Sequence, residues 1–280
     1  MKFTKYHALG NDYLVMDPAG IERPLSPAEI RRICHRNFGV GSDGILWGPV
    51  SESDGRMRVR IFNPDGSEAE KSGNGLRIFS RYLWDRGLVS SEPFPILTAG
   101  DEVFSEVAPG GRSVTVEMGK VSFDSTVIPV RGAAREALNE EIEIEGRRFT
   151  YCAATIGNPH CVILCPEPSE ETARRYGPAI ETDPRFPNRT NVQFMRIVDR
   201  ENIQIEIWER GAGYTLASGS SSSAAAAVAH RLGFCGPEIT VRMPGGSIEI
   251  RIGKDYRITM KGPVTRVCEG TIDPESLEDA

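Results

Sequence analysis

The sequence predicts an α+β protein of two pseudo-symmetric domains, each a curved β-sheet or barrel around a central helix. Strand-like alternation is more frequent along the 280 residues than helical periodicity, which favours curved sheets over alternating parallel β-α units. A serine-glycine turn that opens a helix occurs once in each half of the chain, which indicates a duplicated domain. Both of these helices have almost no polar face, and such helices are normally enclosed by other structure.

Short runs of alternating apolar residues, separated by turn formers, are predicted as strands. They cover residues 57–62, 113–117, 192–197, 203–208, 238–243 and 247–252. Helical periodicity is found chiefly at residues 27–36, 76–85, 170–176 and 222–232. The N-terminal residues 1–17 begin as a strand that runs into a polar loop.

The internal repeat pairs residues 71–79 with residues 217–225, and each segment leads into a helix. Its two serines, Ser72 and Ser218, are 146 positions apart (218 − 72), about half of the 280 residues. Such a spacing is expected if one domain faces its copy. We place the crossing near residues 119–124. The predicted domains are then residues 1–120, to which residues 266–280 return, and residues 121–265.

The two helix starts are candidates for binding an anion. A helix N-terminus exposes unpaired amide groups and the positive end of the helix dipole, which attract carboxylates and phosphates. Gly73 and Gly219 place small residues where a ligand approaches the backbone closely. For one turn alone, a serine that merely caps its helix is the simpler interpretation. The matched pair of turns favours an anion pocket.

Composition narrows the class of protein. The chain is long enough for two domains that need no disulfide or metal, and its net charge of −6 with dispersed Lys and Arg argues against a nucleic-acid partner. No apolar run has the length of a membrane span, and the N-terminus lacks a secretory layout, so we expect a cytoplasmic protein without membrane partners. The six cysteines are scattered, which predicts buried, reduced thiols and no metal site.

Polar clusters stand at residues 8–12, 62–67, 157–160, 189–191 and 208–213. Read singly, each is typical of a plain turn, and His160 or Glu209 has an equally plain structural interpretation. Together they resemble the diaminopimelate epimerase family in order and spacing along nearly the whole chain. The motifs that carry the resemblance are Leu-Gly-Asn-Asp, Asn-x-Asp-Gly-Ser-Glu, Gly-Asn-Pro-His and Glu-Arg-Gly-x-Gly-x-Thr.

The resemblance implies two facing halves with the substrate in the cleft between them. It also implies an amino-acid epimerase or racemase that uses neither metal nor pyridoxal phosphate, with the conversion of LL- to meso-diaminopimelate in lysine biosynthesis as the leading candidate reaction. The partner is then a small amino acid, and the assembly a homodimer. Ser72 and Ser218 match the two catalytic positions, and His160 and Glu209 match the pair that flanks them. Substrate binding is implied for Asn11, Asn63, Gly73, Asn74, Asn158, Asn191, Glu209, Arg210, Gly219 and Ser220.

This chain departs from the family pattern at the catalytic groups themselves. Inverting an α-carbon without a cofactor needs a base on one face and an acid on the other, and the family uses two cysteines for these roles. Here both positions are serine, Tyr214 replaces a common glutamate, and a run of serines follows the second turn. A hydroxyl is a far weaker acid than a thiol, so an assisting group is needed.

Three hypotheses follow from this departure. The first is a serine-based epimerase or racemase, with His160 or Glu209 assisting the serines. The second is a related dehydratase or isomerase that acts on another polar amino or hydroxy acid. The third is an amino-acid binder without catalysis. Exchange of an α-proton distinguishes the first from the third.

Overall fold

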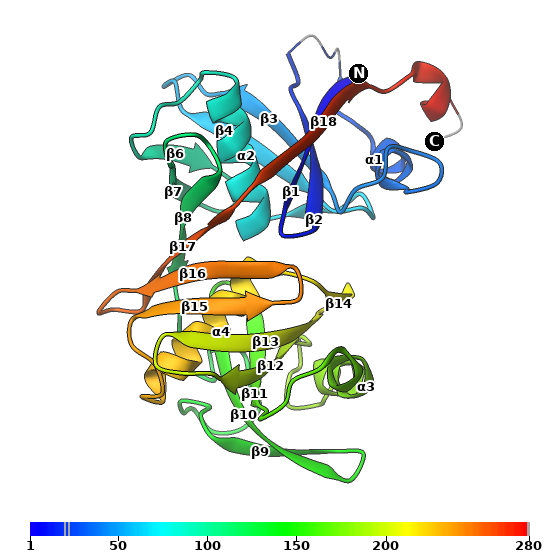
Figure 1. Cartoon of the computed structure of the whole chain (residues 1–280). Coiled ribbons are helices and arrows are strands. Elements are labelled where there is room, and N and C mark those ends of the chain that lie inside the picture. Colours follow the sequence, from blue (N-terminus) through cyan, green and yellow to red (C-terminus); the bar gives the residue numbers. More distant parts are fainter. Residues whose placement is uncertain (20, 22, 279–280) are drawn as a thin grey trace. The chain divides into compact units, whose positions relative to one another are not determined.

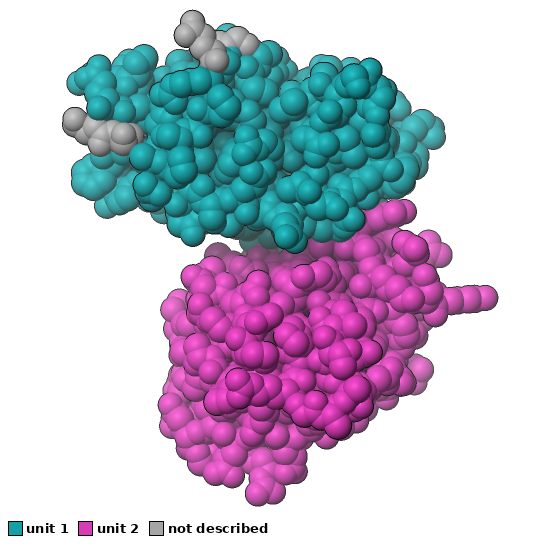
Figure 2. Space-filling model, turned by 180° about the vertical axis from the view of Figure 1, so that it is seen from behind, with its two compact units in different colours: residues 1–116, 262–280 teal, residues 117–261 magenta. Residues whose placement is uncertain are grey.

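A computed structural model describes residues 1–19, 21 and 23–278 of the chain (Figure 1). These residues form two compact units, Met1–Val116 with Gly262–Ala280, and Glu117–Lys261, drawn in separate colours in Figure 2. The predicted divisions followed residues 120 and 265. In the structure the boundaries between the units lie within the strands β8 (Ser113–Lys120) and β17 (Arg257–Pro263).

Unit 1 is a mixed sheet with two α-helices in its described part. The strands that flank the first helix are antiparallel within each hairpin, and β2 pairs in parallel with β3 across that helix. Its elements are β1 (Lys2–Ala8), β2 (Asn11–Met16), α1 (Pro27–Cys34), β3 (Ile45–Ser51), β4 (Met57–Phe62), β5 (Glu68–Ala69), α2 (Gly73–Asp85), β6 (Phe94–Leu97), β7 (Glu102–Val107), β18 (Thr265–Thr271) and a 3-10 turn at Pro274–Leu277.

Unit 2 repeats this plan with other residues. The strand β11 pairs in parallel with β12, as β13 does with β15, and the remaining neighbours along the ladder are antiparallel. Its elements are β9 (Glu140–Ile144), β10 (Arg147–Thr155), β11 (Pro159–Leu164), α3 (Glu170–Glu181), β12 (Asn191–Ile197), β13 (Asn202–Glu209), β14 (Gly213–Thr215), α4 (Gly219–Arg231), β15 (Glu238–Met243) and β16 (Gly246–Ile252).

The strand order shows the duplication directly. In unit 1 the neighbours run β18-β1-β2-β3-β4-β6-β7-β8, and in unit 2 they run β9-β10-β11-β12-β13-β15-β16-β17. In both orders the third and fourth strands are parallel, and so are the fifth and sixth. The predicted α+β class is confirmed, and the repeat found in the sequence corresponds to a repeated topology.

The central helix of each unit is α2 or α4. The helix α2 packs against β1, β2, β3 and β7, and α4 packs against strands from β10 to β16 (Figure 1). Each helix buries all but three of its thirteen residues. Both end alike, because Gly87 and Gly233 adopt positive φ and the next amide bonds back to the carbonyl of Leu83 or Ala229. These two glycines are also 146 positions apart (233 − 87).

The predicted helices are all present with altered bounds. Prediction ended the third helix at residue 176, whereas α3 continues through Gly177 and Pro178 to Glu181. A Cβ at Gly177 would lie 2.5 Å from Trp208 Cγ, so glycine there allows the helix to approach β13 closely. Glu181 lies in this missed turn of α3, and its carboxylate accepts the backbone amide of Gly211 in the turn that follows β13.

Candidate functional site

Ser72 and Ser218 occupy the same position at two similar helix starts. Both residues have extended backbones, with φ and ψ of −140° and 117° for Ser72 and −146° and 125° for Ser218. The Oγ of Ser72 accepts the amide of Gly75 at 3.1 Å, and the Oγ of Ser218 accepts the amide of Ser221 at 3.4 Å. Each serine is therefore an N-cap, and the segments 73–74 and 219–220 begin the helix directly behind it.

A tyrosine contacts the first of these serines. The hydroxyl of Tyr13 on β2 lies 3.2 Å from Ser72 Oγ, and the Tyr13 residue is only 6% exposed. Its ring packs on Gly44, where an added Cβ would lie 2.6 Å from Tyr13 Cε1. Sequence reasoning missed Tyr13, because nothing local to residues 11–13 indicates that they reach residue 72.

Two predicted asparagines of unit 1 are joined to each other. Asn74 Nδ2 donates to Asn11 Oδ1 at 3.0 Å, and Asn11 Nδ2 donates to Asp43 Oδ2 at 2.9 Å. Arg77, which is fully buried in α2, donates to Asn74 Oδ1 at 2.6 Å and to the carbonyl of Pro263 at 3.2 Å. The amides of Asn11 and Asn74 are thereby held in one orientation.

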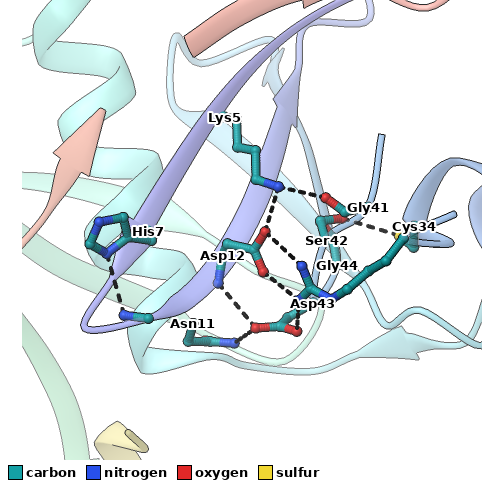
Figure 3. A network of polar contacts seen from close by, with 11 residues as sticks. Lys5, His7, Asn11, Asp12, Cys34, Gly41, Ser42, Asp43 and Gly44 are labelled. Carbon is teal, nitrogen blue, oxygen red and sulfur yellow. Dashed lines mark hydrogen bonds and ion pairs between the residues drawn. The ribbon is translucent and has the colours of Figure 1, made fainter. Parts of the chain in front are cut away.

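Figure 3 shows what fixes Asp43 behind Asn11. Its carboxylate also accepts the amide of Asp12, and Arg36 donates to Asp12 and Asp43 at 2.8 and 2.7 Å. Lys5 lies 2.7 Å from the Asp12 carboxylate. Burial raises the pKa of Asp12, but the hydrogen bonds from Arg36 and Lys5 outweigh this effect and the net pKa is lowered. This ionised cluster makes Asn11 a rigid amide donor and acceptor.

Asn63 lies in a separate turn. Its side-chain Nδ2 donates to Ser67 Oγ at 3.0 Å, and its backbone amide donates to the carbonyl of Ser67 at 2.8 Å. The structure therefore assigns Asn63 a turn-forming role, and its predicted role in substrate binding stays a prediction.

In unit 2 a buried polar chain joins Asn158 to the start of α4. His160 Nε2 lies 2.9 Å from Asn158 Oδ1, and Gln193 Nε2 lies 3.1 Å from His160 Nδ1 and 3.0 Å from Ser221 Oγ. Because Gln193 donates to Nδ1, the proton of a neutral imidazole is on Nε2, which donates to Asn158. Burial lowers the pKa of His160 to about 3, so the ring is neutral near pH 7.

Asn191 ties two predicted site segments together. Its Nδ2 donates to the carbonyl of Pro159 at 2.9 Å, and its Oδ1 accepts the amide of Arg210 at 3.0 Å. The residue is 5% exposed, so both polar ends of its side chain are used within the protein. Asn191 thus positions the loop before β11 and the turn after β13.

Glu181 is a second residue that sequence reasoning missed. Its carboxylate accepts Trp208 Nε1 at 2.7 Å and the amide of Gly211 at 2.9 Å, and it pairs with Arg189. These bonds hold both sides of the turn that contains Glu209, the last residue of β13, and Arg210. The only local signal was a carboxylate close to a helix end, which is common on protein surfaces.

Tyr214 occupies a position where glutamate is common in the family that the sequence resembles, and its hydroxyl contacts a carboxylate. Its hydroxyl donates to Glu206 Oε2 at 2.7 Å, and the Arg174 guanidinium lies 4.6 Å from its ring centroid. Burial raises the pKa of Glu206. Tyr214 also packs on the core cluster that α3 covers, which gives this residue a structural role in unit 2.

Thiols are absent from both helix starts. Five cysteines are buried and one, Cys268, is exposed, and all six are free. Burial raises the pKa of the Cys152 and Cys161 thiols, which keeps them protonated and unreactive. Within the described ranges, no group of three or more His, Cys, Asp and Glu side chains is arranged to hold a metal ion. None of the described helices is long and apolar enough to span a membrane.

Structural comparison shows that the chain shares its fold with solved proteins over nearly its whole length. A hydroxyproline epimerase from Agrobacterium vitis with bound trans-4-hydroxy-L-proline superposes with a TM-score of 0.72 at 16% identity, covering 99% of this chain and 93% of that one. A methylitaconate-delta-isomerase superposes with a TM-score of 0.63 at 11% identity, over 100% and 98% of the two chains. At these identities the likeness establishes the fold.

Sequence comparison identifies the family within that fold. The family model described as diaminopimelate epimerase matches residues 3–124 and 152–267. Diaminopimelate epimerase 2 of Nostoc sp. (strain PCC 7120) is 62% identical over 275 residues, which are 98% of this chain and 96% of that protein. The diaminopimelate epimerase of Desulfitobacterium hafniense is 38% identical, over 100% of this chain and 99% of that protein. The chain belongs to the diaminopimelate epimerase family.

Proposed function

We propose that the chain is an epimerase of diaminopimelate that uses two serines, Ser72 and Ser218, where the family uses two thiols. The observation that carries this proposal is the matched pair of serine-capped helix starts in a chain of this family. Each start combines a serine hydroxyl with the first backbone amides of a helix and the positive end of its dipole. No metal and no pyridoxal phosphate takes part in the proposed reaction.

The proposed chemistry divides the reaction between the two serines. One serine, whose hydroxyl proton passes to an assisting group, takes the α-proton from one epimer, so that the Cα–H bond breaks and an Oγ–H bond forms, while the other serine gives its proton to the opposite face of the same carbon and is left ionised. In the reverse direction the roles exchange. The amides of Gly73, Asn74, Gly219 and Ser220 bind the α-carboxylate and stabilise the negative charge that develops on it as the proton leaves.

The remaining predicted residues orient the substrate. Asn11 and Asn158 offer amides that are fixed by Asp43 and by His160, and Arg210 carries a cation suited to a second carboxylate. We propose that His160, being neutral and bonded to Asn158, acts as a positioning residue. We propose that Glu209 lies beside the reacting groups. Asn191 Oδ1 accepts the backbone amide of Arg210 and so helps to position that residue.

The first test follows the conversion of LL-diaminopimelate to the meso form by chiral chromatography. We expect conversion by the purified chain that is unaffected by a metal chelator and by borohydride, which reduces Schiff bases. The Ser72→Cys/Ser218→Cys variant should convert faster, since a thiol is the stronger acid. Tight binding of diaminopimelate without conversion by either protein would contradict the proposal.

Assembly and location complete the proposal. We propose a homodimer in the cytoplasm that serves lysine biosynthesis, in line with the family. Light scattering at several protein concentrations measures the assembly: a mass near twice 30.7 kDa supports the dimer, and a mass near 30.7 kDa contradicts it.

A further inference from the structure

Tyr13 stands out among the polar groups of unit 1 because its partner is Ser72. The phenol and the serine hydroxyl are 3.2 Å apart, which is within hydrogen-bond reach of each other, and either oxygen is able to donate. Tyr13 is 6% exposed, and its ring is held against Gly44, where no side chain larger than hydrogen fits. Packing on Gly44 therefore fixes the position of the Tyr13 ring in this contact.

We propose that Tyr13 is the proton-relay partner of Ser72, so that the phenol and the serine act together as one acid-base unit. This inference rests on the proposed epimerase function. A serine hydroxyl is too weak an acid to be ionised near neutral pH, whereas an unperturbed phenol has a pKa of about 10. The acidity that a thiol supplies within one residue is thus supplied here by two.

The relay is balanced in protons and electrons. When Ser72 acts as the base, its Oγ takes the α-proton while its own proton passes to the Tyr13 phenolate, which leaves a substrate carbanion and a neutral phenol. When Ser72 acts as the acid, its proton passes to the carbanion, the phenol gives its proton to Oγ, and a phenolate remains. No additional reactant is consumed in either direction.

The other ionisable groups around Tyr13 have partners of their own. On the face of the β1–β2 ladder that carries Tyr13, its register partner Tyr6 donates to Asp85 at 2.8 Å, and burial and this carboxylate raise the pKa of Tyr6. On α2, Arg77 is bonded to Asn74 and to a carbonyl.

Asp43, in the loop before β3, is paired with Arg36. Lys71 directly precedes Ser72 in the turn before α2.

Unit 2 provides an internal control for this inference. The motif Gly-Asn-x-x that contains Tyr13 recurs as residues 157–160, with His160 in the matching place. His160 bonds Asn158 and Gln193, and Ser218 Oγ lies 3.5 Å from Ser220 Oγ. The relay is therefore specific to Ser72, and Tyr13 substitutions should affect only the proton transfer that Ser72 performs.

The test is a double-mutant cycle of Tyr13→Phe and Ser72→Cys, read as α-proton exchange into deuterated water. Phenylalanine keeps the ring on Gly44, and unchanged thermal unfolding checks that the fold is intact. We expect Tyr13→Phe to slow α-proton exchange of the epimer that Ser72 deprotonates by roughly 100-fold, and to remove the increase of this exchange rate with pH. The exchange rate of the other epimer should change by less than about threefold. In the Ser72→Cys background Tyr13→Phe should cost less than about threefold, since a thiol ionises unaided. Equal losses in both backgrounds, or no loss in the Ser72 background, would overturn the relay.

A second readout does not depend on turnover. With tyrosine labelled at Cζ, the signal lost in Tyr13→Phe identifies Tyr13, and its titration reports the ionisation of the phenol. We expect Ser72→Ala to shift this midpoint by about half a pH unit or more, and Ser218→Ala to leave it unchanged. A midpoint that ignores Ser72→Ala overturns the inference. If the midpoint shifts but no diaminopimelate exchanges, the proton-sharing pair stands and the proposed substrate is wrong.

Discussion

The two helix starts share one backbone design and differ in chemistry. Ser72 and Ser218 cap thirteen-residue helices with nearly equal φ and ψ, and each accepts the amide three residues on. Around Ser72 the fold places a phenol and, one turn into the helix, the buried cation of Arg77. The residue 146 positions after Arg77 is Ser223, whose hydroxyl bonds the carbonyl of Gly219.

The duplicated units thus keep the backbone positions of the two cap serines, but the side chains around the two serines differ. Burial lowers the pKa of Arg77 to about 10, so it still carries its charge near neutral pH, whereas the chain of His160, Gln193 and Ser221 in unit 2 is neutral. The Ser72 hydroxyl lies 3.2 Å from the Tyr13 phenol, whereas the Ser218 hydroxyl lies 3.5 Å from the hydroxyl of Ser220. The two epimers should therefore lose their α-protons at different rates.

The largest expected effect comes from removing one serine at a time. Ser72→Ala and Ser218→Ala should each reduce conversion of LL- to meso-diaminopimelate by about 10³-fold or more, because inversion needs a group on both faces. Chiral chromatography measures the residual rate. Ser80→Ala, a buried serine of α2 away from the helix start, is the matched control for loss of a hydroxyl. If either variant keeps the wild-type rate of conversion, the claim that both cap serines are required for inversion is contradicted.

A second contrast concerns two carboxylates that accept several hydrogen bonds, Glu181 in unit 2 and Asp43 in unit 1. Glu181 has a side chain only 5% exposed and holds three donors, whereas the side chain of Asp43 is 39% exposed. Glu181→Gln puts an amide donor against those donors and should lower the free energy of unfolding by about 3 kcal/mol, and Asp43→Asn should cost about 1 kcal/mol.

Urea denaturation measures both of these losses. Glu143→Gln, on an exposed part of β9, should change stability by less than about 0.5 kcal/mol and serves as the surface control. Equal losses in the free energy of unfolding for Glu181→Gln and Asp43→Asn would show that burial does not determine how much each carboxylate stabilises its unit.

A smaller effect tests the neutral histidine of unit 2. The pKa of His160 is about 3 in the folded chain and about 6.5 in the unfolded chain, so between these values only the unfolded chain binds the proton. Stability is therefore lost as the pH falls through this window, and the His160 share of the loss between pH 7 and pH 5 is about 2 kcal/mol.

His160→Gln should reduce the acid-induced loss of stability by about that amount, measured by urea denaturation at both pH values. The exposed His35→Gln is the control, since it should leave the loss nearly unchanged. An unchanged pH dependence in His160→Gln would mean that burial does not lower the pKa of this imidazole in the folded chain.

The sequence predicted the fold class, the repeat and the two helices that follow serine-glycine turns, because each depends on local signals such as alternation, glycine turns and helix starts. The family resemblance implied substrate-binding roles for Asn11 and Asn74; the structure bonds their amides to each other, and the substrate-binding roles stay predictions. Sequence reasoning missed Tyr13 and Glu181, whose partners Ser72 and Gly211 are far away along the chain. Such contacts are made by the packing of β2 and α3, and no residue pattern near Tyr13 or Glu181 encodes them.

The most direct test of the serine mechanism is α-proton exchange in deuterated water, followed by proton NMR on LL- and meso-diaminopimelate separately. The wild-type chain should exchange the α-proton of both epimers. Ser72→Ala should keep exchange of one epimer and lose that of the other, and Ser218→Ala should show the reverse pattern, because each serine serves one face. No exchange by the wild-type chain, or exchange of both epimers by both variants, would contradict the account.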